Sequence, residues 1–167
     1  MKIQVIRMKR EDQEKFLNLY NLYLYDLSEY NGDELKEDGK FDPTNTYLYL
    51  ERDELQPFFI IKDDKVVGFI LICSAPFVSD GIDYSIQELF VLKKYRGNQI
   101  AGKAVELVLE KLEGKIRVEQ LKANKAAVHF WKKFYNQTDI KYSEGEEVVE
   151  IEGLEGKHII VFQEFKR

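Results

Sequence analysis

The sequence is poor in cysteine and histidine. Its 167 residues include one cysteine and two histidines. A single cysteine cannot form an internal disulfide bond, and Cys73 lies in the apolar run VVGFILICS, so we expect it to fill space in the core. His129 and His158 lack the spacing of metal ligands. We therefore expect no metal site.

Long hydrophobic runs and an excess of positive charge are also missing. No apolar run approaches the roughly 20 residues that a membrane-spanning helix needs. The opening stretch MKIQVIRMKRED carries charges where a signal peptide would have an apolar segment, so we expect a cytoplasmic protein without a membrane partner. The formal net charge of −5 disfavours binding to a phosphate backbone, so nucleic acid is not an expected partner.

What is present fits one globular domain. Hydrophobic residues make up 44% of the chain and charged residues 33%, which is close to the ordinary mixture of soluble proteins. The length suits a single domain with a full core, and no repeat, low-complexity tract or linker divides it. We expect residues 1–167 to form that domain, and a homodimer is compatible with the sequence.

Hydrophobic periodicity predicts alternating strands and helices. Period-two patterns and apolar runs predict strands at residues 2–7, 58–62, 66–73, 82–92, 115–121 and 158–165. Helical spacing predicts helices at residues 11–30, 100–112 and 125–135, with Asn124 as the last N-cap. Residues 31–46 read as a loop with room for a short helical turn. The order mixes antiparallel and parallel pairing, so the fold class is α/β in the α+β sense.

The segment from Arg96 to Lys103 leads from a strand through a charged turn into an amphipathic helix. Backbone N–H groups at a helix N-terminus lack partners and favour a phosphate group, and small residues let the phosphate approach. An ordinary strand-to-helix connection is the alternative. The segment also satisfies most of a nucleotide P-loop pattern, but Ala104 stands where a hydroxyl should hold Mg²⁺, so we reject an NTPase.

The motif Arg96-Gly97-Asn98-Gln99-Ile100-Ala101 resembles the pyrophosphate motif of the GCN5-related N-acetyltransferase (GNAT) superfamily, with Gln99 in place of one glycine. The flanking segments ELFVLKKYRG and NKAAVHFW also resemble the family, and YLYDLSEYNGDELKEDGKF is similar to a bacterial subgroup of predicted acetyltransferases. The resemblance implies the GNAT fold, with a mixed, mostly antiparallel sheet of about seven strands and about four helices. It also implies acetyl-CoA as co-substrate, without a metal.

Carried over to this sequence, the resemblance implies three groups of cofactor contacts. The main chain at Leu89, Phe90 and Val91 would pair with the pantetheine amides. The turn from Gly97 to Gly102 would hold the pyrophosphate, and Asn124, at the start of the later helix, would hydrogen-bond the pantetheine end. Trp131 occupies the place of the tyrosine that protonates the thiolate in many members, and it would pack instead, with Tyr135 or Tyr84 as alternative acids. The implied cofactor-binding residues are Leu89, Phe90, Val91, Arg96, Gly97, Asn98, Gln99, Ile100, Ala101, Gly102, Lys103, Asn124 and Trp131.

A base is needed because an amine with a pKa of about 10.4 is protonated at neutral pH. Glu88 shares the parity of Ile86 and Phe90, which places a carboxylate on an apolar strand face. Glu88 is therefore the candidate catalytic base. The alternative is a structural glutamate whose parity is altered by a β-bulge. The family's best-known base glutamate lies about three positions earlier, where this chain has Ser85.

The acceptor is expected beside the first helix, where Tyr23 and Tyr30 are candidate substrate-binding residues that offer aromatic faces to a cationic amine. The acidic run at residues 143–150 reads as a solvated hairpin loop, or as a surface that attracts a basic acceptor. The predicted function is transfer of an acetyl group to a primary amine of a small molecule or a protein. A non-catalytic acyl-CoA-binding or regulatory module is the alternative.

Overall fold

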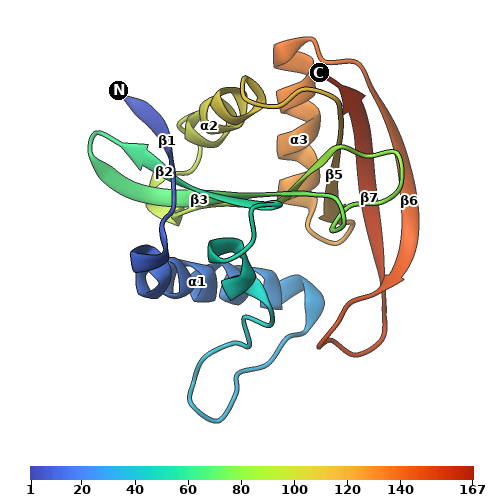
Figure 1. Cartoon of the computed structure of the whole chain (residues 1–167). Coiled ribbons are helices and arrows are strands. Elements are labelled where there is room, and N and C mark those ends of the chain that lie inside the picture. Colours follow the sequence, from blue (N-terminus) through green and yellow to red (C-terminus); the bar gives the residue numbers. More distant parts are fainter.

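Seven strands form one central sheet in the computed structural model, which describes all 167 residues (Figure 1). Their order across the sheet is β1-β2-β3-β4-β5-β7-β6, and only the β4–β5 pair is parallel. The strands are β1 (Ile3–Arg7), β2 (Leu55–Lys62), β3 (Lys65–Ser74), β4 (Tyr84–Val91), β5 (Lys115–Leu121), β6 (Tyr142–Glu150) and β7 (Lys157–Lys166).

Helices cover both faces of the sheet. The helix α1 (Gln13–Asn31) lies on one face, and α2 (Ile100–Leu109) and α3 (Lys125–Thr138) lie on the other (Figure 1). The segment after α1 contains the 3₁₀ turn η2 (Thr46–Leu50) instead of a further α-helix. The chain thus has three α-helices, slightly fewer than the expected four. None of them combines the length and hydrophobicity that crossing a bilayer requires.

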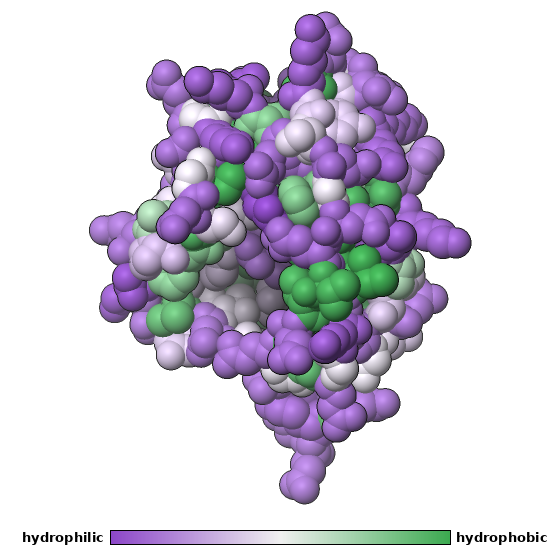
Figure 2. Space-filling view, turned by 90° about the vertical axis from the view of Figure 1, so that its right-hand side faces the viewer, coloured by the Kyte–Doolittle hydropathy of each residue, from purple (hydrophilic) through white to green (hydrophobic).

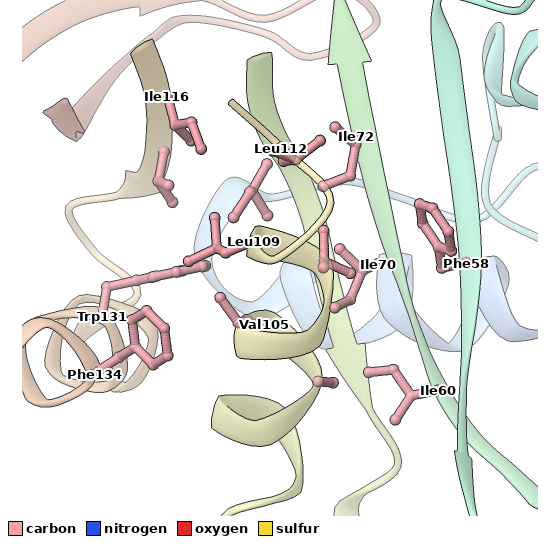
Figure 3. Close-up of a cluster of buried hydrophobic side chains, with 14 of the residues drawn as sticks. Phe58, Ile60, Ile70, Ile72, Val105, Leu109, Leu112, Ile116, Trp131 and Phe134 are labelled. Carbon is pink, nitrogen blue, oxygen red and sulfur yellow. The ribbon is translucent and has the colours of Figure 1, made fainter. Parts of the chain in front are cut away.

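Two hydrophobic clusters hold these layers together. In the larger one, β-strand residues such as Ile70 and Ile72 meet Leu109 of α2 and Trp131 of α3 (Figure 3). The smaller cluster lies under α1 and contains Met8, Phe16, Tyr20, Phe59, Ile61, Phe69, Leu71 and Phe90. Alternate residues of β3 enter opposite clusters, because successive strand side chains point to opposite faces.

The predicted elements correspond to observed ones, with one correction. The acidic run at residues 143–150 is not a loop, because it lies within the strand β6. This strand pairs only with β7 and forms an edge of the sheet. Charged side chains are common on edge strands, where they discourage pairing with another chain. A run of glutamates is therefore compatible with a strand at this position.

Two irregularities of β4, a β-bulge and a short pairing with β5, shape the candidate functional site. Opposite β3, Ile86 pairs with Ile72 and Glu88 pairs with Leu71, so Gln87 is an extra residue in a β-bulge. Opposite β5, only the first three residues of β4, Tyr84 to Ile86, pair with a neighbour. Beyond Ile86 the two parallel strands separate. The second half of β4 consequently has a strand partner on one side only.

Candidate functional site

A long cleft opens where β4 and β5 separate. Its volume is about 1880 Å³, and it extends from the N-terminus of α2 to the segment after α1 and the loop between β6 and β7. The surface is hollowed on the face shown in Figure 2, and hydrophobic residues gather beside the opening. The cleft is lined by every candidate site residue predicted from the sequence except Asn98 and the two alternative acids, Tyr84 and Tyr135. Asn98 lies in the turn, where its side-chain amide donates to the carbonyl of Arg96 at 3.4 Å.

The turn before α2 presents unused hydrogen-bond donors. The backbone N–H groups from Gly97 to Gly102 donate to no other group of the protein, and the first helical bond runs from Lys103 to the carbonyl of Gln99. Unpaired N–H groups and the helix dipole together favour an anion at this position. The turn therefore has the main-chain geometry of a phosphate site.

Gln99 adopts a left-handed backbone conformation, with φ at 61°. This region favours glycine, because the Cβ of other residues approaches the following carbonyl oxygen. The motif glycine that Gln99 replaces thus has a conformational role here. Gln99 is exposed, so its side chain does not have to fit into the core. The turn keeps its conformation, but the backbone at Gln99 is strained.

Arg96 is already occupied by contacts within the protein. Its guanidinium donates to the carbonyl of Val91 at 2.7 Å, forms an ion pair with Asp26 of α1, and lies over the ring of Phe90. Lys103 lies 3.6 Å from Glu106 on its own helix. The expected positive charges are thus partly neutralised. The main-chain donors are the uncommitted groups of the turn.

The edge of β4 that faces the gap is free for pairing. Leu89, Phe90 and Val91 pair with β3 on one side, and no strand lies against them on the other. Across the gap, Asn124 is the N-cap of α3, as predicted: its side-chain oxygen accepts the N–H of Ala127 at 3.1 Å. The amide nitrogen of Asn124 stays uncommitted at the wall of the cleft.

The sequence predicted a packing role for Trp131 and offered Tyr135 and Tyr84 as alternative acids. Trp131 is 4% exposed and belongs to the core, where it packs against Phe130 and Phe134. The hydroxyl of Tyr135 is buried against Gln163, at 3.3 Å. Neither Tyr135 nor Tyr84 lines the cleft, so neither is placed to protonate a leaving group there.

Glu88 lies in the cleft and is partly buried. Its carboxylate accepts a hydrogen bond from the hydroxyl of Tyr23 on α1. The predicted shared face with Ile86 is wrong, because the bulge at Gln87 turns Ile86 toward α2 and α3 while Glu88 faces α1 with Phe90. The β-bulge considered in the alternative of a structural glutamate is thus present, but it places the carboxylate of Glu88 in the cleft.

The surroundings of Glu88 shift its protonation. Burial raises the pKa of Glu88 to about 7, the hydrogen bond from Tyr23 lowers it, and the nearby charge of Glu119 raises it. A carboxyl group with this pKa changes charge near neutral pH, as suits a general base. Glu88, a carboxylate among apolar residues in the sequence, thus also has an unusually high pKa in the structure.

The cleft lining carries charges of both signs, which sequence reasoning missed. The basic side chains of the lining lie on the turn, α2 and α3: Lys93, Arg96, Lys103 and Lys133. The lining also contains carboxylates without any ion pair: Glu29, Asp33, Glu34, Asp42, Glu150 and Glu152. These acidic residues come from the segment around the end of α1, where Tyr30 also lines the cleft, and from the loop between β6 and β7.

The two acidic segments meet although they are far apart in the sequence. In Figure 1 the loop between β6 and β7 lies beside the segment that follows α1. A Cβ atom placed on Gly153 would lie 4.0 Å from the methyl group of Thr44. This close contact bounds the cleft at Gly153 and Thr44. The sequence carries no local signal for the contact, because the contact depends on how the β6–β7 hairpin curves.

Comparison with solved structures identifies the fold. A probable acetyltransferase from Staphylococcus epidermidis superposes with a TM-score of 0.67 at 12% identity, covering 99% of each chain. An acetyltransferase of the GNAT family from Streptococcus pneumoniae gives 0.64 at 15% identity, covering 99% of this chain and all of the other. The PaiA N-acetyltransferase of Thermoplasma acidophilum, in complex with coenzyme A, gives 0.60 at 14% identity with full coverage of both.

Comparison of the sequence itself agrees with the fold. A search of curated protein sequences finds no match. The family model described as "Acetyltransferase (GNAT) family" matches residues 14–135, which is most of the chain and includes Glu88, the turn and Asn124. The seven-stranded mixed sheet is the one expected from the resemblance. The protein is therefore a member of the GNAT acetyltransferase family.

Proposed function

We propose that the protein transfers an acetyl group from acetyl-CoA to a primary amine, with Glu88 as the general base. The observation that carries the proposal is the carboxylate of Glu88 in a cleft that also offers free main-chain donors. When bound, acetyl-CoA supplies an acetyl group activated as a thioester. The name of the structural neighbour PaiA N-acetyltransferase supports nitrogen as the acceptor atom.

The residues present fit acetyl-CoA. The N–H groups from Gly97 to Gly102 would hold the pyrophosphate at the N-terminus of α2. The free edge of β4 at Leu89 to Val91 would pair with the pantetheine amides in the manner of an added strand. The amide nitrogen of Asn124 would donate from the opposite wall. The acyl end would then lie between β4 and β5, on the side of Glu88.

Glu88 would remove the proton that blocks the attack. An alkylammonium group with a pKa of about 10.4 cannot attack a carbonyl until it loses a proton. A carboxylate with a pKa of about 7 accepts that proton at neutral pH and above. The neutral nitrogen then forms its bond to the acetyl carbon directly, without an enzyme-bound acyl group. The carbon–sulfur bond breaks, coenzyme A leaves as a thiolate, and the proton lost by the new amide nitrogen balances the one that the thiolate takes up.

The charges of the cleft favour a cationic acceptor. Besides Glu88, six carboxylates of the lining form no ion pair, and the protein as a whole has a net charge of −5. A cleft lined by one sign of charge concentrates ligands of the opposite sign. We therefore propose a basic amine, of a small molecule or of a protein. Tyr30, which lines the cleft beside Glu29, would contribute an aromatic face.

The direct test is release of free coenzyme A thiol in the presence of acetyl-CoA and a panel of amines. We expect release that depends on the amine and falls about 10²- to 10⁴-fold in Glu88→Gln, the usual contribution of a general base. Glu113→Gln is the matched control, because Glu113 is exposed and lies outside the cleft. An equal loss in both variants, or none in Glu88→Gln, would remove Glu88 as the base.

The alternative is an acyl-CoA-binding module without catalysis. It is favoured by one observation: Trp131, Tyr135 and Tyr84 do not supply an acid for the thiolate in the cleft. Calorimetric titration with coenzyme A separates the cases. Binding without thiol release for any amine would support the module, whereas absence of binding would contradict both proposals.

A further inference from the structure

We propose that Tyr23 is a positioning residue that fixes Glu88 for catalysis, instead of a residue that contacts the acceptor. The inference rests on the proposed role of Glu88 as base. It assigns the first helix a part in the chemistry, because Tyr23 lies on α1 and reaches across to β4.

The two carboxylate oxygens of Glu88 differ in their hydrogen bonds. Oε2 of Glu88 accepts the hydroxyl of Tyr23, and Oε1 accepts no hydrogen bond from the protein. No buried side-chain oxygen of the protein lacks a partner, so Oε1 is not enclosed. Because Glu88 lines the cleft, Oε1 opens into it. Tyr23 thus holds one oxygen and leaves the other to receive a proton.

The ring of Tyr23 is held in place by its neighbours. Its centroid lies 5.6 Å from Tyr20, 5.6 Å from Phe69 and 5.9 Å from Phe90. These rings come from α1, β3 and β4, so the phenol is enclosed on several sides. A ring packed in this way keeps one rotamer, because the dense core leaves no room for another. The hydroxyl is therefore directed to Glu88.

A second contact fixes α1 itself. Asp26 lies three residues after Tyr23, on the same face of the helix, and pairs with Arg96 and with Lys93, whose amine lies 3.8 Å from it. The helix is thus attached to β4 through Tyr23 and to the phosphate turn through Asp26. Both contacts hold the phenol at a constant position relative to the cleft.

Other titratable groups around Glu88 do not replace this donor. Tyr20 on α1 and Tyr49 on η2 stay protonated because burial raises the pKa of each hydroxyl. Burial likewise raises the pKa of the Cys73 thiol on β3 to about 11. Glu119 on β5 is an acceptor whose charge opposes ionisation of Glu88. Tyr23 is the group that donates to the carboxylate.

The test is the substitution Tyr23→Phe, which removes the hydroxyl and keeps the ring. The hydrogen bond favours the charged carboxylate, so its loss should raise the pKa of Glu88. We expect the acidic limb of the pH–rate profile to move to higher pH by about one pH unit, and kcat to fall about fivefold at about pH 7 and about tenfold at lower pH. KM for the amine should stay within about twofold of the wild-type value, because the phenol does not contact the acceptor.

Tyr20→Phe is the matched control. Tyr20 belongs to the same aromatic cluster, but its hydroxyl lies beside Thr46 and does not bond Glu88. Both variants can lose stability, yet only Tyr23→Phe should move the profile. An unmoved profile in Tyr23→Phe, or an increase in KM with kcat unchanged, would overturn the proposal and restore Tyr23 as an acceptor contact.

A measurement without substrate separates this proposal from the proposed function. The side-chain carboxyl of Glu88 is followed by NMR in protein labelled at glutamate, with Glu88→Gln to assign the signal. Wild-type Glu88 should titrate near pH 7, and its midpoint should rise in Tyr23→Phe. An unchanged midpoint overturns the role of Tyr23 even in an inactive protein. A shifted midpoint in a protein that acetylates no amine contradicts the proposed function alone.

Discussion

Asp26 of α1 and Arg96 of the turn before α2 form an ion pair between residues 70 positions apart in the sequence. The carboxylate of Asp26 also lies 3.8 Å from the amine of Lys93. One helix carboxylate therefore neutralises two of the cations nearest the phosphate turn. This arrangement determines how much positive charge the turn offers an anion.

Asp26→Asn should strengthen the binding of coenzyme A. Removal of the negative charge frees Arg96 and Lys93 to interact with phosphate, and we expect the dissociation constant to fall about two- to fivefold at low salt. Calorimetric titration at low and high salt measures this change. Asp42→Asn, which removes a lining carboxylate that forms no ion pair with the turn, should leave the affinity unchanged. Weaker binding in Asp26→Asn would mean that the ion pair is needed to shape the turn.

Glu88 should make stability depend on pH. Its pKa is about 7 in the folded protein against an ordinary value of 4.5, so the folded state binds the proton more tightly. This contribution to stability is full below about pH 4.5 and is lost as the pH rises through about 7. Relative to Glu88→Gln, the wild type should lose about 2 to 3 kcal/mol of unfolding free energy between about pH 5 and about pH 8. Urea denaturation of both proteins across this range measures the difference, and parallel curves would contradict it.

Gln99→Gly should stabilise the protein. Glycine relieves about 1 to 2 kcal/mol of strain at the left-handed φ of 61°, and greater freedom of the unfolded chain offsets about 0.5 to 1 kcal/mol of this gain. The expected net gain is about 0.5 kcal/mol in unfolding free energy. Gln99→Ala is the control, because it keeps the Cβ atom and should bring no gain. A less stable glycine variant would show that the glutamine side chain makes a favourable contact.

Trp131→Ala should mainly reduce stability. The side chain is 4% exposed and packs between α2 and α3, so its loss should cost about 3 to 5 kcal/mol. Val148→Ala, at an exposed site on β6, should change stability by less than about 0.5 kcal/mol. Thermal denaturation compares the two variants. A small effect of Trp131→Ala on stability, together with lost coenzyme A binding, would make Trp131 a ligand contact more than a core residue.

Much of the architecture was predictable because it depends on local patterns. The alternation in KIRVEQL and the helical spacing after Asn124 reflect which side chains face the core, and the observed elements follow them closely. The acidic run at residues 143–150 was read wrongly because an edge strand open to solvent needs no apolar face. The charge of this segment therefore obscured its pairing with β7.

The chemistry was predictable in part. Glu88 was identified because a carboxylate among apolar residues is unusual, but its direction was not, since alternation fails at a bulge. The pairings of Tyr23 with Glu88 and of Asp26 with Arg96 join distant parts of the chain. Such contacts leave no local pattern in a single sequence, and only the folded arrangement reveals them.

The bulge at Gln87 means that the pairing register of β4 matters as much as its residues. If β4 kept its length but paired with β3 without the bulge, Gln87 would lie opposite Leu71, and Glu88 would move to the opposite layer, among the aliphatic residues that face α2 and α3. The carboxylate would then be separated from Tyr23 and buried without a donor. Removal of Gln87 itself would instead keep Glu88 opposite Leu71. A change of strand register can therefore inactivate a relative that retains all the recognisable motifs, whereas loss of the bulged residue alone leaves the carboxylate facing α1.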